Sequence, residues 1–144
     1  MVEVQNKTGR LVEIRGSFPL TPGEVDQFER DLRDSLTARG ERKTVCADIT
    51  RLHVLRREYA DRLLTVMRED NGSIDRTAIL LAPDSPMVEL QFSRILSEAE
   101  SPNRRFFRER DALSVWLGAT LNSLEQARLH DFLSEGDAAG MPTV

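Results

Sequence analysis

The sequence predicts a single α/β domain with a mixed, mostly parallel sheet. Short apolar runs typical of strands alternate with amphipathic helical patterns along most of the chain, and such alternation requires crossover connections between parallel strands. A chain of 144 residues is about the size of one domain, and no internal repeat or linker divides it. We therefore expect one domain over residues 2–133 that ends in an extended helix, followed by a disordered tail over residues 134–144.

A β-hairpin is predicted to open the domain. Two strand-like runs, "VEVQ" and "RLVEIRGSF", flank the turn "NKTG", where Gly9 is suited to a positive φ. The first helix follows, with Thr21 as its cap and Glu24 completing a capping box. Its apolar residues recur at intervals of three and four, which marks one buried face: Val25, Phe28, Leu32 and Leu36.

Three further strands and three further helices complete the predicted order β-β-α-β-α-β-α-β-α. "KTVCADI" and "RTAILLAP" are apolar runs typical of central strands, and "RRFF" is a brief last strand. Helical patterns follow these strands over residues 60–67, 85–96 and 113–124. Gly118 is expected to kink or split the last helix, since Gly costs about 1 kcal/mol relative to Ala inside a helix.

Composition and charge argue against several classes of protein. The hydrophobic fraction of 40% and the charged fraction of 31% are ordinary for a soluble globular protein. The net charge of -4 comes from intermixed acidic and basic residues, which argues against a nucleic-acid-binding surface. No apolar run approaches the ~20 residues that span a bilayer, and the N-terminus lacks the apolar core of a signal peptide. We expect a cytoplasmic protein with no nucleic-acid partner and no transmembrane segment.

Charged side chains are interpreted mainly as surface groups. The arginines around the last strand are expected to be outward cations that protect an edge strand from pairing: Arg104, Arg105, Arg108 and Arg110. The helices carry pairs at i, i+4 spacing that suit surface ion pairs: Glu29 with Arg33 and Glu58 with Arg62.

Catalytic signals are sparse. There is no Gly-rich phosphate loop and no G-x-S-x-G elbow, and the lone Cys46 lies in an apolar run where a thiol is usually a small buried hydrophobe. Asp48 follows a buried strand at the edge where α/β sheets bind ligands, but a turn-stabilising carboxylate is the simpler interpretation. Catalysis by Asp48 with His53 would require the two side chains to converge. We expect no catalytic residue, no metal site and no cofactor.

The segment "DITRLHVLRREYA" contains the most unusual turn in the chain. Arg56, Arg57 and Glu58 lie where a strand passes into a helix, with no Gly, Ser or Asn among them. Two cations at a helix N-terminus are slightly unfavourable with the helix dipole, and the glutamate offsets them only in part. The turn therefore either faces a partner or anionic ligand, or is tolerated because it is exposed.

The region "VCADITRLHVLRREYADRLL" resembles the STAS superfamily, in particular its SpoIIAA-like (STAS/SEC14-type) branch. The signature of those domains begins with an Asp at the end of a central strand and reaches Asp-Ser-Ser-Gly at the next helix start. Asp48 matches the first position, and residues 56–59, Arg-Arg-Glu-Tyr, occupy the places of Asp-Ser-Ser-Gly. The segment "RRFFRERDALSVWL" is similar to the closing pattern of the branch, so that the resemblance covers residues 2–118.

The resemblance implies a non-catalytic regulatory module that acts through protein contacts in bacterial signalling. In the anti-sigma-factor antagonists of that superfamily, phosphorylation of a serine in the motif breaks partner binding. Arg57 stands at that position here and cannot accept a phosphate, so the usual switch is absent. The expected partner-binding surface runs from the strand end to the helix start: Asp48, His53, Arg56, Arg57, Glu58 and Tyr59.

Two further expectations concern what the protein binds. The SEC14-like label implies a small-molecule or lipid-binding alternative, which predicts an enclosed apolar pocket near the second and third helices. A homodimer is the other expectation, because the last helix carries more apolar residues than one small domain is expected to cover: Leu121, Leu124 and Phe132.

Overall fold

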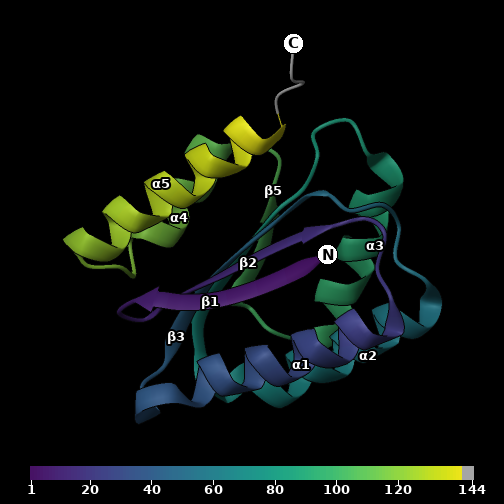
Figure 1. Ribbon diagram of the computed structural model, residues 1–144, viewed down its shortest axis with the longest axis horizontal. Coiled ribbons are helices and arrows are strands. Elements are labelled where there is room, and N and C mark those ends of the chain that lie inside the picture. The colour runs from purple at the N-terminus through teal and green to yellow at the C-terminus, as the bar shows by residue number, and fades with distance from the viewer. Residues whose placement is uncertain (141–144) are drawn as a thin grey trace.

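The computed structural model describes residues 1–140 and contains a five-stranded sheet flanked by helices (Figure 1). The strands lie in the order β1-β2-β3-β4-β5, with the bounds β1 (Val2–Thr8), β2 (Leu11–Ser17), β3 (Lys43–Arg51), β4 (Ile74–Leu80) and β5 (Arg104–Phe107). β1 and β2 form the antiparallel hairpin, and every later pair is parallel. The predicted fold class is therefore confirmed.

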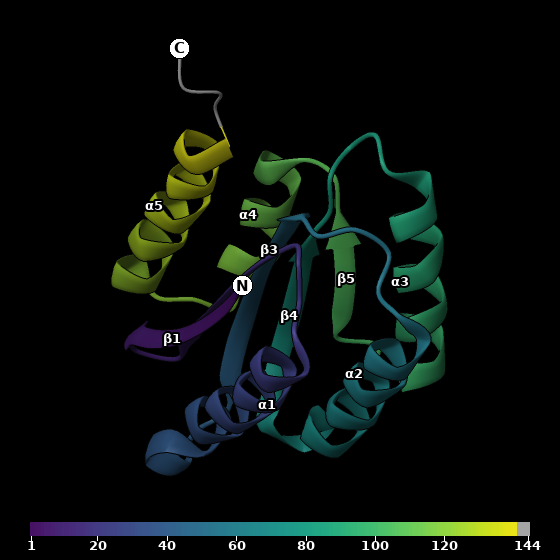
Figure 2. The ribbon, with the colours of Figure 1, turned by 45° about the vertical axis from the view of Figure 1, so that its right-hand side comes forward.

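The helices form two layers, one on each face of the sheet (Figure 2). The first layer contains α1 (Pro22–Thr37), α2 (Arg57–Asp70) and α3 (Pro86–Ala99), and the second contains α4 (Arg110–Gly118) and α5 (Ser123–Gly140). Short 3-10 turns follow α1 and α2 at Ala38–Gly40 and Asn71–Ser73. The predicted last helix is thus split after Gly118, which adds one helix to the expected order.

Local sequence signals act as expected at the start of the chain. Gly9 has a φ of 54° in the turn of the hairpin, a conformation that Gly adopts without steric cost. The hydroxyl of Thr21 accepts a hydrogen bond of 3.2 Å from the backbone N–H of Glu24, which caps α1. These contacts depend on neighbours in the chain, and so they were predictable.

Strand alternation divides the core between the two layers. Along β3, Val45, Ala47 and Ile49 pack in the cluster under α1, α2 and α3. Cys46, between them in sequence, points to the opposite face and packs with residues of α4 and α5. Burial raises the pKa of the Cys46 thiol, which agrees with the predicted buried hydrophobe.

Helix α5 is longer and more closely docked than the sequence indicated. It runs to Gly140, so the predicted boundary between residues 133 and 134 falls inside a helix, and residues 134–140 of the predicted tail are helical. Residues 141–144, the remainder of that tail, lie outside the described residues. Leu121 and Phe132 are buried against this chain's own sheet, and Leu124 is 77% exposed. Most of the apolar face that was expected to support a homodimer therefore packs against the sheet of the same chain.

Ion pairs attach α5 to the sheet. Arg128 donates to both carboxylate oxygens of Glu13 on β2, at 3.0 and 2.7 Å. Arg15 donates to Asp48 on β3 at 2.8 Å and to the carbonyl of Phe132 in α5 at 2.7 Å. Because buried charges are tolerated when they are paired and hydrogen-bonded, these contacts satisfy the polar groups of this interface.

Candidate functional site

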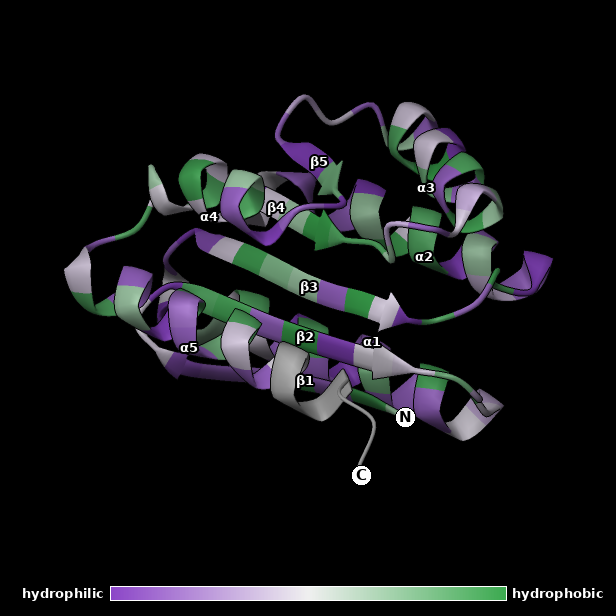
Figure 3. Ribbon diagram, turned by 90° about the horizontal axis from the view of Figure 1, so that it is seen from above, coloured by the Kyte–Doolittle hydropathy of each residue, from purple (hydrophilic) through white to green (hydrophobic). Residues whose placement is uncertain are grey.

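An apolar cavity of about 130 Å³ lies between the sheet and helices α1 and α2. Figure 2 shows α1 and α2 in the same helix layer, and Figure 3 shows hydrophobic stretches along β2 and β3. An apolar cavity of such a size favours a small apolar molecule over water. Its apolar lining comes from both layers: Ile14, Val45, Ala47, Ile49 and Ile79 of the strands, and Val25, Phe28, Leu32, Leu63, Val66 and Met67 of the helices.

Charged residues bridge the two helices at the edge of the cavity. Arg62 of α2 donates from Nε to Glu29 of α1 at 2.8 Å and from Nη2 to Asp26 of α1 at 2.7 Å. Arg33 of α1 lies 3.8 Å from Glu69 of α2. The predicted i, i+4 pairs within each helix were therefore wrong, because the arginines reach across to the neighbouring helix. These bridges join α1 to α2, and the cavity lies between the apolar faces of the two helices and the sheet.

Tyr59 brings an unpaired polar group to the cavity. Its side chain lines the cavity and is only 7% exposed, and its hydroxyl is buried without a hydrogen-bond partner. Leaving a buried hydroxyl unsatisfied costs about 1–3 kcal/mol. The unpaired hydroxyl and the apolar space beside it make this cavity the candidate site of the molecule.

Two charged residues belong to the opposite end of the cavity. Asp70, at the end of α2, and Arg104, the first residue of β5, both line it. Desolvation lowers the pKa of Arg104 to about 10, although Asp70 acts in the opposite direction. Desolvation also raises the pKa of Asp70, and here the charge of Arg104 opposes the shift. Tyr59 and the two charged residues thus lie at opposite ends of the cavity, whose walls are almost wholly apolar.

Arg104 corrects the interpretation of the last strand. Its side chain is buried toward the α2 layer, where Nη1 donates to Oδ1 of Asn71. Arg105 lies on the other side of the strand, with its guanidinium 5.4 Å from the ring of Trp116. Alternation along a strand places residues of the same parity on one face, so Arg104 shares the face of the partly buried Phe106. This parity was the signal that could have identified Arg104 as an inward residue.

Asp48 is a structural carboxylate. It is 3% exposed, accepts hydrogen bonds from the backbone and hydroxyl of Thr50 at 3.1 and 2.8 Å, and pairs with Arg15. Within the described residues, no hydrogen bond or ion pair joins Asp48 to His53. The contacts of Asp48 match the simpler interpretation of this residue as a stabiliser of the turn.

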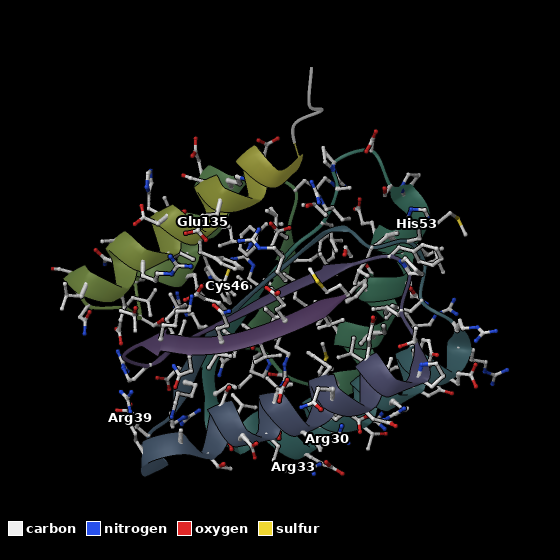
Figure 4. All side chains as sticks on the ribbon, viewed as in Figure 1. Arg30, Arg33, Arg39, Cys46, His53 and Glu135 are labelled. Atoms are coloured by element: carbon white, nitrogen blue, oxygen red, sulfur yellow. The ribbon has the colours of Figure 1, made fainter. Side chains whose placement is uncertain are left out.

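His53 and the arginine turn lie on the surface. The ring of His53 stacks on that of Phe18 with 4.7 Å between centroids, at the opposite end of the molecule from Arg39 (Figure 4). Arg56 is exposed, and its guanidinium lies 3.8 Å from the carboxylate of its near neighbour Glu58. Arg57 is exposed beside them. The loop is held to α3 by Gln91, whose side-chain amide exchanges two hydrogen bonds of 2.8 Å with the backbone of Leu55.

The six residues of the expected partner-binding surface therefore separate into three groups. Asp48 faces α5, His53 and the turn at residues 56–58 face solvent, and Tyr59 points into the cavity. Asp48 and Tyr59 are buried on opposite faces of the sheet, and the other four residues are exposed.

The structure describes no helix, within residues 1–140, that is long and apolar enough to cross a membrane. In the same part of the chain, no three side chains of His, Cys, Asp or Glu gather as metal ligands.

Comparison with known proteins shows the fold. No protein-family model and no curated protein matches the sequence. Among solved structures, the crystal structure of an uncharacterized protein from the DUF3478 family of Shewanella loihica PV-4, which has a SpoIIAA-like fold, is similar with a TM-score of 0.60. The two chains are 17% identical, and the match covers 81% of this chain and 92% of that chain. This chain has a SpoIIAA-like fold, as the sequence resemblance implied.

Proposed function

We propose that this SpoIIAA-like protein is a non-catalytic module that binds an apolar small molecule between its sheet and helices α1 and α2. The observation that carries the proposal is the buried, unpaired hydroxyl of Tyr59 beside an apolar cavity. A cavity with apolar walls and a few polar groups is the usual form of a small-molecule site. The pocket lies mainly under α1 and α2, whereas the sequence predicted it near the second and third helices.

Calorimetric titration tests this function with phenylnaphthylamine, a neutral apolar probe. We expect saturable binding with one molecule per chain. Leu63→Trp should abolish binding, because Leu63 lines the cavity and a larger side chain would fill it. Leu90→Trp is the matched control, since Leu90 is exposed on α3. The proposal fails if the native protein shows no saturable heat, or if the two substitutions have the same effect.

A second candidate function is a protein-contact module that works in signalling without the serine switch. Exposed apolar side chains on segments that follow the strands support it: Phe18 after β2, Val54 between β3 and α2, and Met87 and Leu90 on α3. Clusters of exposed apolar residues mark interaction sites more often than isolated ones do. The surface of this candidate excludes Asp48 and Tyr59, which are buried.

Pull-down from the native cytoplasm tests the contact surface. A partner should be recovered with the native protein and lost with Arg56→Glu/Arg57→Glu, because the change reverses two exposed charges beside the apolar side chains. Arg39→Glu is the control at the far end of the molecule (Figure 4). A partner that survives the double substitution does not use this surface.

A homodimer also remains a proposal. Sedimentation at high concentration is its test, with Leu124→Lys as the variant, since Leu124 is exposed on α5. A strictly monomeric native protein would argue against it.

A further inference from the structure

We propose that the free edge of β5 binds an extended, acidic segment of a partner protein as an added strand. The proposal is independent of the cavity under α1 and α2. It rests on an edge strand with open backbone groups, on a tryptophan contacted by two guanidiniums, and on the lack of a carboxylate beside those guanidiniums in the described part of the chain.

β5 forms one end of the sheet, with β4 as its neighbouring strand, and β1 lies at the other end (Figure 3). The carbonyls of Asn103 and Phe107 accept hydrogen bonds from Thr77 and from the residue that follows β4, at 2.9 and 2.8 Å. Because successive residues of a strand direct their backbone groups to opposite sides, Arg104 and Phe106 direct theirs away from β4. Such open backbone groups are the template on which a partner strand is added.

The side of this edge that faces α4 carries a tryptophan contacted by two arginines. The guanidinium of Arg105 lies 5.4 Å from the ring centroids of Trp116 and Phe107. The guanidinium of Arg76 on β4 lies 4.8 Å from the centroid of the Trp116 ring, and its Nη1 donates to the Trp116 carbonyl at 2.5 Å. Cation–π contacts favour one position of each guanidinium, so both charges lie beside the edge before a partner arrives.

The charge of this surface favours an acidic partner. Within residues 1–140, neither Arg76 nor Arg105 has a carboxylate within ion-pair distance. Opposite charges on directly opposed residues of neighbouring strands stabilise the pair of strands, and like charges destabilise it. An acidic residue opposite Arg105 is therefore favoured, whereas a second copy of this chain would bring its own Arg105 to the same edge. The outward cation discourages self-pairing of β5 and still suits an acidic strand.

An extended protein segment fits this surface better than a nucleic acid does. Glu109 and Asp111 are exposed just after β5, so a phosphate backbone with a charge at every nucleotide would meet acids as well as cations. The chain as a whole carries a net charge of -4. A polypeptide can also bond to the open backbone groups of β5 in a regular ladder.

Fluorescence titration tests the proposal, because Trp116 is the only tryptophan of the chain and lies at the site. The probe is a short capped peptide of alternating valine and glutamate, and it is compared with the same peptide carrying glutamine or lysine in place of glutamate. We expect the glutamate peptide to change the emission saturably. It should bind about fivefold or more tightly than the glutamine peptide, the range of exposed charge pairs, and the lysine peptide should bind most weakly.

Arg105→Glu should remove the preference for glutamate over lysine, because it replaces the cation opposite the added strand with an acid. Arg30→Glu is the matched control, since it makes the same change of charge on the exposed surface of α1 (Figure 4), and it should keep the preference. Thermal unfolding of each variant establishes that it is folded before titration. Arg105→Gln, which should reduce the preference, serves if Arg105→Glu does not fold.

Methylated peptides test whether the contact is a strand pairing. Backbone N-methyl groups are placed on the valines of one glutamate peptide and on the glutamates of another. A strand added to β5 turns one of these two sets of amides toward the edge, so the peptide methylated on that set should bind more weakly than the unmodified peptide. If both methylated peptides bind as tightly as the unmodified one, the partner is not added as a strand.

The other outcomes identify a different occupant or a different place. Equal binding of the glutamate, glutamine and lysine peptides by native protein, or no saturable change with any of them, would overturn the acidic partner. A preference that survives in Arg105→Glu would overturn the role of this edge. Tighter binding of oligothymidylate than of the glutamate peptide would indicate a nucleic acid instead, and a native dimer that Arg105→Glu dissociates would indicate a second copy. Binding of phenylnaphthylamine is measured separately, so the proposed function and this proposal fail independently.

Discussion

The two faces of the sheet are built in different ways. On the α4 and α5 face, buried charged groups form ion pairs: Arg128 donates to Glu13, and Arg15 donates to Asp48. On the α1 and α2 face, the walls are apolar, space remains between them, and the hydroxyl of Tyr59 has no partner. The difference indicates that α5 is a fixed part of the fold, whereas the opposite face leaves an apolar cavity.

Removing a buried ion pair should have the largest effect on stability. Asp48→Ala leaves Arg15 half-buried without its carboxylate and removes both hydrogen bonds to Thr50. We expect a loss of about 3–5 kcal/mol in the free energy of unfolding, measured by urea denaturation. Asp61→Ala is the control, since Asp61 is exposed on α2. A loss below about 1 kcal/mol would show that this face does not depend on the pair.

The close packing of α5 against the sheet can be tested at Gly136. A Cβ there would lie 2.3 Å from both Arg15 Nη1 and Asp48 Oδ2, so Gly136→Ala should force the pair or the helix to move. We expect a loss of about 1–3 kcal/mol, measured as a lower midpoint of thermal unfolding. Gly23→Ala is the matched change in α1, where a Cβ meets nothing within 4 Å. Similar effects at the two positions would contradict the close approach.

A smaller effect of opposite sign is expected on the cavity face. Tyr59→Phe removes the unpaired hydroxyl, so it should stabilise the ligand-free protein by about 1 kcal/mol, as measured by urea denaturation. If Tyr59→Phe instead destabilises protein from which copurifying molecules have been removed, the hydroxyl is hydrogen-bonded in solution. The proposed contrast between the two faces would then be wrong.

The smallest effect should be a pH dependence at Asp70. Desolvation raises the pKa of Asp70 in the folded protein, so the native state holds its proton more firmly than the unfolded chain does. Its contribution to stability is therefore present at low pH and is lost as pH rises through the raised pKa. Asp70→Asn should be more stable than native protein at neutral pH, with the difference shrinking toward pH ~4. Urea denaturation at several pH values would measure this, and a difference independent of pH would contradict it.

Much of the fold was predictable because its signals are local. The Thr21 cap, the Gly9 turn and the spacing of apolar residues in α1 depend on neighbours in the chain. The candidate site was less predictable. Nothing in the sequence around Arg62 indicates that it bonds to α1 rather than to Glu58, because that choice depends on how two helices are placed.

The amino-acid sequence by itself determined the order of strands and helices and the type of domain, since periodicity and capping act within a few residues. The tertiary structure decided which side chains meet. It turned Tyr59 and Arg104 toward the same cavity from distant elements and placed Asp48 on the opposite face, against α5. Such contacts arise from helix packing over the sheet, which no short stretch of sequence encodes.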